Sequence, residues 1–116
     1  MARDTLSIQT IGSLASPELE DVTFTAGVAA NDLQFANDGD VLVLINNAGA
    51  SPQDAVFSSV ADPFGRTGDL TVSTANGEIS IAGPFPTALW NQSDGNVYID
   101  ITTEDSFSFA AVKFLR

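Results

Sequence analysis

Carboxylates are the main side chains in this sequence that could do chemistry, because it contains neither histidine nor cysteine. Serine and cysteine triads need an imidazole base, and most zinc, iron and copper sites need imidazole or thiolate ligands. What remains is a pair of acids for glycoside hydrolysis, or an oxygen-ligand site for a hard cation such as calcium.

Two acidic turns are the candidates for such chemistry. The run from Asn37 to Asp40 could offer oxygen ligands to calcium, but it lacks the spacing of an EF-hand loop, and Asp-Gly also turns a chain between strands. Glu104 and Asp105 could supply one acid of a hydrolytic pair, although adjacent acids at a turn are usually solvated. We interpret both as turns, and expect no enzyme, no metal and no cofactor.

Aromatic residues in loops are candidates for binding. In the loop from Asp62 to Gly68, Phe64 and Arg66 are residue types that anchor interfaces, although the ring could equally cap the core. The segment 82–91, AGPFPTALWN, holds two prolines and no titratable group. Its Trp90 could stack on a sugar, but packing under the fold or against a partner suits its proline-rich surroundings better.

The net charge of −11 arises from 15 acidic and 4 basic residues. Without a basic stripe, we expect no direct contact with nucleic acid or with an anionic membrane. Solubility, a saline habitat or a basic partner could each explain the acidity. The polar start and the lack of any run of about 20 apolar residues predict neither a secretion signal nor a membrane span.

Period-two alternation of apolar residues predicts β-strands. It is clearest over Asn96–Thr102, directly after an Asp94-Gly95 hairpin signal. The run Val41–Ile45 is apolar throughout, which indicates a central strand covered on both faces or a strand that meets a neighbouring subunit. Further alternating pairs are Leu6 and Ile8, Val22 and Phe24, Leu33 and Phe35, Leu70 and Val72, and, after an Asn76-Gly77 turn, Ile79 and Ile81.

The last strand changes phase, because Phe107 and Phe109 share one face while Val112 and Phe114 share the other. This predicts a β-bulge at Ala110-Ala111. The length favours one domain, and turn residues recur every 8 to 12 positions or so, as in sandwiches.

We therefore predict an all-β, single-domain β-sandwich over residues 1–116, jelly-roll or immunoglobulin-like, with about eight short antiparallel strands. We expect at most one helical turn, at Ser16–Glu20, and an arm at residues 1–5 that is flexible or binds a partner.

Several short motifs follow one another along the chain. They begin with Phe35-Ala36-Asn37-Asp38-Gly39 and continue with Asn47 and Gly49. They then run through Ile81-Ala82-Gly83-Pro84-Phe85-Pro86 and Trp90-Asn91 to the two closing strands. In this order the motifs resemble those of a group of short proteins encoded among the head genes of tailed phages and prophages. Asp40 departs from the group, in which the residue after Asn-Asp-Gly is often basic.

This resemblance implies a virion structural protein that decorates or cements a capsid. Its partner would be the major capsid protein, its location the capsid surface after assembly in the host cytoplasm, and its state a homo-oligomer, for which we expect a trimer. Alternatives are a carbohydrate-binding or adhesion module, and a head-completion or tail protein of the same virion. Rigid prolines beside aromatic rings suit docking, so we expect partner contacts at Asn47, Phe64, Arg66, Pro84, Phe85, Pro86 and Trp90.

Overall fold

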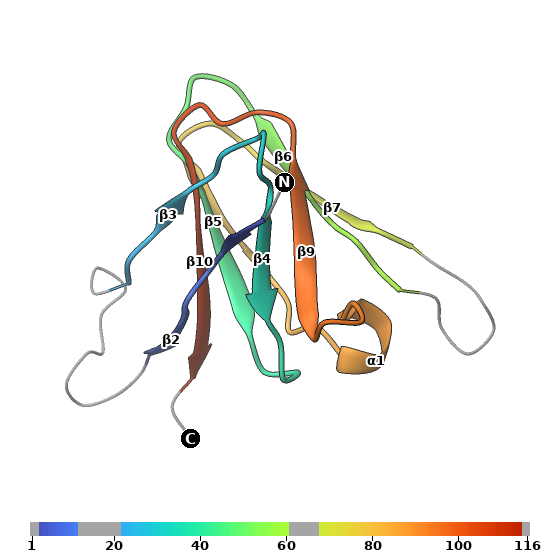
Figure 1. The fold of residues 1–116 in the computed structure, drawn as a ribbon. Coiled ribbons are helices and arrows are strands. Elements are labelled where there is room, and N and C mark those ends of the chain that lie inside the picture. Colours follow the sequence, from blue (N-terminus) through green and yellow to red (C-terminus); the bar gives the residue numbers. More distant parts are fainter. Residues whose placement is uncertain (1–2, 12–21, 61–67, 115–116) are drawn as a thin grey trace.

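The computed structural model describes residues 3–11, 22–60 and 68–114 of the 116-residue chain. Within these ranges the fold is a two-layered β-sandwich with ten strands and one short helix (Figure 1). The elements are β1 (Asp4–Thr5), β2 (Ile8–Ile11), β3 (Thr25–Ala26), β4 (Leu33–Ala36), β5 (Leu42–Asn47), β6 (Gln53–Phe57), β7 (Leu70–Thr74), β8 (Glu78–Ala82), α1 (Thr87–Trp90), β9 (Asn96–Ile101) and β10 (Phe107–Phe114).

The strands form two mixed sheets of five. Sheet A has the order β1-β4-β9-β6-β7, and sheet B the order β2-β10-β5-β8, with β3 beside β2 on the same edge of β10. The predicted all-β sandwich is confirmed, but its strands are neither eight in number nor all antiparallel. The N-terminal stretch crosses between the sheets and runs parallel to its partners, as β1 along β4 and then as β2 along β10.

Residues 3–5 are not a free arm, contrary to our expectation. Arg3 donates hydrogen bonds to the carbonyl oxygens of Leu33 (3.1 Å) and Ile99 (3.2 Å), and its guanidinium lies 2.7 Å from a carboxylate oxygen of Asp100. Asp4 and Thr5 pair with β4. These contacts tie the start of the described chain to sheet A; residues 1 and 2 lie outside the described ranges.

The core lies between the sheets and is built from strand residues that alternate as the sequence predicts. On β9, Val97, Ile99 and Ile101 are buried, while Tyr98 and Asp100 are only partly buried. Five phenylalanine rings fill much of the interior and are at most 2% exposed: Phe35, Phe57, Phe85, Phe107 and Phe109.

The apolar run around β5 is buried on both faces. β5 is central in sheet B, between β10 and β8. Val43 and Ile45 belong to the main core, whereas Leu44 joins a second apolar cluster with Val22 and Val112. This confirms the central-strand interpretation.

The second cluster also explains why the predicted bulge is wrong. The ladder between β10 and β5 is regular through both alanines, with Ala110 opposite Leu44 and Ala111 opposite Val43. Ala111 faces the main core and Ala110 the second cluster. The change of phase thus reflects a strand that is buried on both faces, so no extra residue is required.

Two turns connect different elements from those the sequence predicts. The Asn76-Gly77 turn joins β7 of sheet A to β8 of sheet B, so these strands do not form a hairpin within one sheet. The Asp94-Gly95 turn follows α1 rather than a strand, and of its two residues only Gly95 has a positive φ (+83°). The helical turn predicted at Ser16–Glu20 lies outside the described residues.

Candidate functional site

The segment from Gly83 to Trp90, which we call the proline segment, joins β8 to the end of α1 at one end of the sandwich. Its Phe85 is 2% exposed. The ring centroid lies 5.0 Å from that of Phe57, in a stacked arrangement, and 5.4 Å from that of Trp90, edge-on. Phe85 therefore belongs to the core, and its side chain is not available to a partner, which corrects our expectation for this residue.

An amide cluster holds the backbone of the proline segment from beneath. The Asn37 side-chain amide donates to the carbonyl oxygen of Phe85 (2.8 Å) and to Oδ1 of Asn91 (2.7 Å). Asn91 in turn donates to the carbonyl oxygen of Asn37 (3.0 Å). Residues of three motifs thus meet in one place: Phe-x-Asn-Asp-Gly, Gly-Pro-Phe-Pro and Trp-Asn. Their hydrogen bonds hold this end of the sandwich together.

Gly83 is required at the start of this segment. Its φ is +109°, and a Cβ atom there would lie 2.9 Å from the carbonyl oxygen of Val41. Any other residue would be strained in this conformation, and its Cβ would press on the backbone just before β5. The glycine therefore allows the segment to turn closely around the end of the sandwich.

The outward side of the proline segment is exposed and apolar. Pro84, Pro86, Ala88 and Leu89 are all exposed, and we call these four residues the proline face. Trp90 is half-buried and packs against the core, where its ring meets that of Phe85 edge-on. No residue from 79 to 93 is charged, although the chain carries a net charge of −11. The arrangement offers a rigid, uncharged surface suited to docking and devoid of titratable groups.

Asn47, another expected contact, is completely buried at the opposite end of the sandwich from the amide cluster. Its amide donates to the carbonyl oxygens of Ser51 (2.9 Å) and Thr74 (2.8 Å), and its Oδ1 accepts from the Gln53 amide (2.6 Å) and the Gly49 N–H (3.0 Å). All of these partners are internal. The expectation of a partner contact at Asn47 is therefore wrong, because its polar atoms close the loops at this end.

Phe64 and Arg66, also expected as contacts, lie in residues 61–67, outside the described ranges.

The acidic turns are held by hydrogen bonds within the turn and from the fold around them. Oδ1 of Asp38 accepts from the Asp40 N–H (3.0 Å), and Lys113 lies 3.1 Å from Oδ2. The hydrogen bond from the Asp40 N–H, followed by that from Lys113, lowers the pKa of Asp38. A carboxylate oxygen of Asp105 accepts from the Ala50 N–H (3.2 Å). Across the described ranges no group of three or more acids could hold a metal ion, and these contacts favour the turn interpretation.

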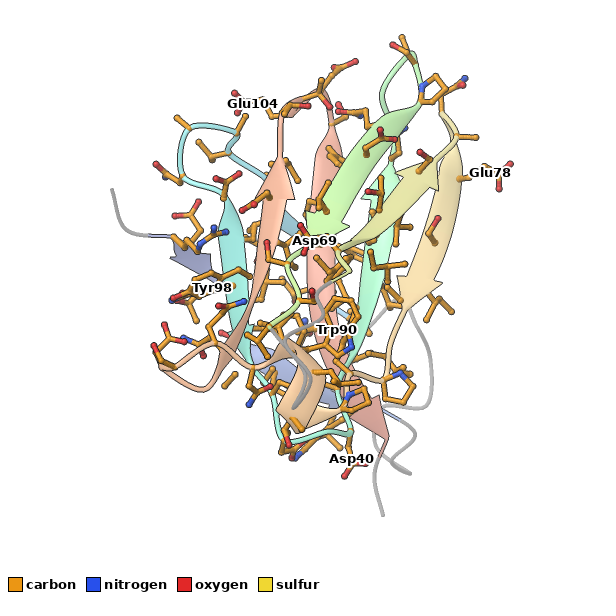
Figure 2. All side chains as sticks on the ribbon, turned by 90° about the vertical axis from the view of Figure 1, so that its right-hand side faces the viewer. Asp40, Asp69, Glu78, Trp90, Tyr98 and Glu104 are labelled. Carbon is orange, nitrogen blue, oxygen red and sulfur yellow. The ribbon has the colours of Figure 1, made fainter. Side chains whose placement is uncertain are left out.

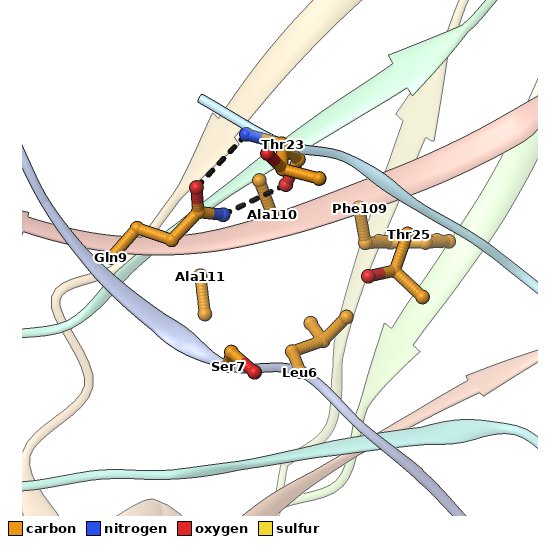
Figure 3. Close-up of a pocket in the computed structure, with 8 residues that line it drawn as sticks. All are labelled: Leu6, Ser7, Gln9, Thr23, Thr25, Phe109, Ala110 and Ala111. Carbon is orange, nitrogen blue, oxygen red and sulfur yellow. Dashed lines mark hydrogen bonds between the residues drawn. The ribbon is translucent and has the colours of Figure 1, made fainter. Parts of the chain in front are cut away.

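Two cavities open on the described part of the molecule. The first, of about 310 Å³, lies where β2 and β3 diverge along the edge of β10 (Figure 3). Its wall includes Gln9, whose amide clamps the backbone of Thr23 through hydrogen bonds of 2.7 and 2.9 Å. The second, of about 340 Å³, opens beside the Lys113–Asp38 pair. The lining of the first contains no titratable group, and that of the second a single acid, so neither presents a catalytic pair of acids.

The fold and the site together define an all-β sandwich domain whose distinctive feature is an uncharged, apolar border on an acidic molecule. Comparison with protein-family models, curated proteins and solved structures finds no match for the chain. In the described ranges, α1 has only four residues and no helix is long and apolar enough to cross a membrane.

The sequence did not predict three features of the fold: the Asn37–Asn91 amide cluster, the anchoring of Arg3, and the exposure of Ile79 (57%) and Ile81 (65%). The uncharged stretch 79–93 was the available signal for the last. Alternation predicts that these isoleucines share one face of a strand, but it does not say whether that face is covered.

Proposed function

We propose that the protein is a non-enzymatic structural protein of a tailed-virus particle, which decorates the outer surface of the head and stabilises it by binding the major capsid protein. The motif resemblance supports the class of protein. The observation that carries the proposal is the proline face, which is exposed, uncharged and fixed to the core through Phe85.

The mechanism requires a surface that loses little entropy on docking. Pro84 and Pro86 restrict the backbone before any partner arrives. The Phe85 ring and the hydrogen bond from Asn37 hold the same segment from inside. A pre-ordered apolar surface keeps more of its contact energy as affinity.

Stabilisation of the head then follows from mass action. A protein that binds the assembled lattice but not the free subunits shifts the equilibrium towards the lattice. The acidic remainder of the surface, with a net charge of −11 over the chain, faces solvent and keeps copies soluble before assembly.

Quantitative mass spectrometry of purified particles from the virus or prophage that encodes the chain tests the proposal. We expect hundreds of copies per particle. A dozen or fewer would indicate a head-completion or tail protein instead, and complete absence from particles would reject the virion assignment.

A pair of variants locates the contact. Leu89→Asp places a charge on the proline face, where Leu89 is 39% exposed and is not part of the core, so we expect the fold to persist and binding to emptied particles to fall at least tenfold. Thr71→Asp, on exposed β7, is the matched control and should bind as the unaltered protein does. Equal binding by both variants would reject the proline face as the docking surface.

A further inference from the structure

The free edge of sheet B is a second exposed apolar feature, separate from the proline face. Among the described residues, β8 pairs with β5 on one side and ends the sheet on the other. Figure 2 shows β8 at the border of the sandwich, with Glu78 at its start pointing away from the other strands. The backbone groups on the outer side of β8 are therefore free of any sheet partner.

β8 has few of the features that normally protect an edge strand. Its sequence, Glu-Ile-Ser-Ile-Ala, has no lysine or proline, its single charge stands at the first position, and its ladder with β5 is regular from Ala82 to Glu78. Exposed edges are usually blunted by charge, proline or a bulge, because they otherwise pair with another strand. Ile79 and Ile81 stand on the exposed face of this strand, 57% and 65% exposed.

The edge of sheet A that β7 forms has a different character. Its exposed side chains are Leu70, which is 38% exposed, Thr71 and Ser73, and Ser73 donates a hydrogen bond to Asp54 of the neighbouring β6. Asp69 directly precedes the strand. A polar edge bordered by carboxylates is not a surface on which an acidic protein pairs with itself.

We propose that β8 pairs with β8 of a second copy, antiparallel and about a two-fold axis at Ser80, to form a continuous sheet across a symmetric dimer. This dimer takes the place of the trimer that the motif resemblance implies. A two-fold interface must be self-complementary, so that residue i meets j while j meets i. The Ile-Ser-Ile sequence meets this condition, because Ile79 then lies opposite Ile81 of the second copy, twice. Opposed side chains of this kind are about 5 Å apart at Cβ and stabilise a sheet.

Charge selects the direction of the pairing. Two copies, each with a net charge of −11, repel one another over most of their surface. Self-association therefore requires a contact without charged residues, and residues 79–93 are the longest uncharged stretch of the sequence. In the antiparallel register, Glu78 lies opposite Ala82, so the two Glu78 residues are about 14 Å apart. This exceeds the screening length of about 8 Å at physiological salt. Parallel pairing would place the two carboxylates side by side.

A five-residue edge with two isoleucines is a small interface, at the low end of the range for specific contacts, below about 1,200 Å². The dimer should therefore be reversible, with a dissociation constant of up to about 1 mM, which corresponds to an association free energy of about 4 kcal/mol. It should be visible at protein concentrations up to that value. Added salt should strengthen it, since screening weakens the repulsion between copies.

Sedimentation of the full chain at increasing concentration is the first test. We expect dimers for the unaltered protein, at least tenfold weaker dimerisation for Ile81→Asp, and unchanged dimerisation for the control Thr71→Asp on β7. Ile81 is exposed, so its replacement should leave the core intact, which a circular dichroism spectrum checks. A monomer at every concentration, or a dimer that Ile81→Asp does not weaken, would overturn the proposal.

Disulfide trapping tests the register, since the chain contains no cysteine. A mixture of Ile79→Cys and Ile81→Cys proteins should form a heterodimeric disulfide several times faster than either protein alone, because these positions oppose one another across the axis. A mixture of Thr71→Cys and Ser73→Cys is the control on β7. Equal rates in the two mixtures, or faster trapping of either β8 variant with itself, would reject this pairing.

The dimer and the docking proposal fail separately. Leu89→Asp should leave dimerisation unchanged while it weakens binding to particles, and Ile81→Asp should do the reverse. If Ile81→Asp abolished particle binding and the free protein were monomeric, β8 would pair with a strand of another protein, which contradicts a second copy as its occupant.

Discussion

The outward faces of the two sheets differ in what covers them. On sheet A the outward residues of β9 are Tyr98 and Asp100, polar groups that bind other surface side chains. On sheet B, Leu44 and Val112 point outward and are almost completely buried, because the chain around Val22 lies across them. One face of sheet A meets the core, whereas both faces of sheet B's centre are buried.

This difference in covering explains why the strands of the two sheets have different apolar patterns in the sequence. Strands buried on one face alternate between apolar and polar residues, whereas strands buried on both faces are apolar throughout. β9 shows the first pattern, and β5 the second. The two most exposed large apolar side chains, Ile79 and Ile81, lie on β8, where the covering of sheet B ends.

The largest expected effect is a stability difference between truncations on the two outward faces. Leu44→Ala, in sheet B, should lower the free energy of unfolding by about 2–5 kcal/mol, because it leaves a cavity under Val22. Val56→Ala, on the half-buried outward face of β6 in sheet A, should cost about 1 kcal/mol or less. Urea denaturation measures both, and similar losses would show that the outward faces are equally covered.

A smaller effect is expected from two ion pairs, that of Arg3 with Asp100 on sheet A and that of Lys113 on sheet B with Asp38. Arg3→Ala should lower the free energy of unfolding by about 1–3 kcal/mol, because the guanidinium contacts two backbone carbonyls, Asp100 and the ring of Tyr98, 4.2 Å away. Lys113→Ala should cost about 1 kcal/mol or less, since its pair with Asp38 is exposed on both sides. Denaturation of both variants at low and high salt checks this ranking.

A pH-dependent effect is expected on sheet A. The Tyr98 hydroxyl donates to Asp94 (2.8 Å), and this bond raises the pKa of Tyr98 above 10.0 and lowers the pKa of Asp94 below 3.8. The stabilisation from the raised group is complete below pH 10 and is lost as pH rises through the folded pKa of Tyr98. That from the lowered group is present above pH 3.8 and is lost as pH falls through the folded pKa of Asp94.

Tyrosinate absorbance measures the upper transition without ambiguity, because Tyr98 is the only tyrosine. The folded protein should titrate at a higher pH than the urea-unfolded chain, and Asp94→Asn should move the folded value back towards 10.0. A folded pKa at or below that of the unfolded chain would contradict the hydrogen bond.

The smallest effect is expected at the exposed isoleucines of β8. Ile79→Thr should change the free energy of unfolding of the dilute monomer by no more than about 0.5 kcal/mol, because the side chain is 57% exposed and threonine suits a strand. Thermal melts at low protein concentration measure it. A loss comparable to that of Leu44→Ala would place Ile79 in a covered face.

The sequence predicted the sandwich and most strands, because local alternation reports burial on one side. It predicted less well where contacts are long-range. The bulge at Ala110-Ala111 was wrong because the covering of sheet B comes from residues far away in the chain. The partner contacts at Phe85 and Asn47 were wrong because a ring or amide in a loop can turn inward or outward, and only packing decides which.

The sequence by itself determined the all-β class, the lack of imidazole and thiolate chemistry, and the uncharged stretch from 79 to 93, since these depend on composition and local order. Only the tertiary structure decided that Phe85 points inward while Pro84 and Pro86 remain outside, and that β8 ends a sheet. The reason is physical: the side on which a strand or loop is covered depends on segments distant in sequence, which no local pattern records.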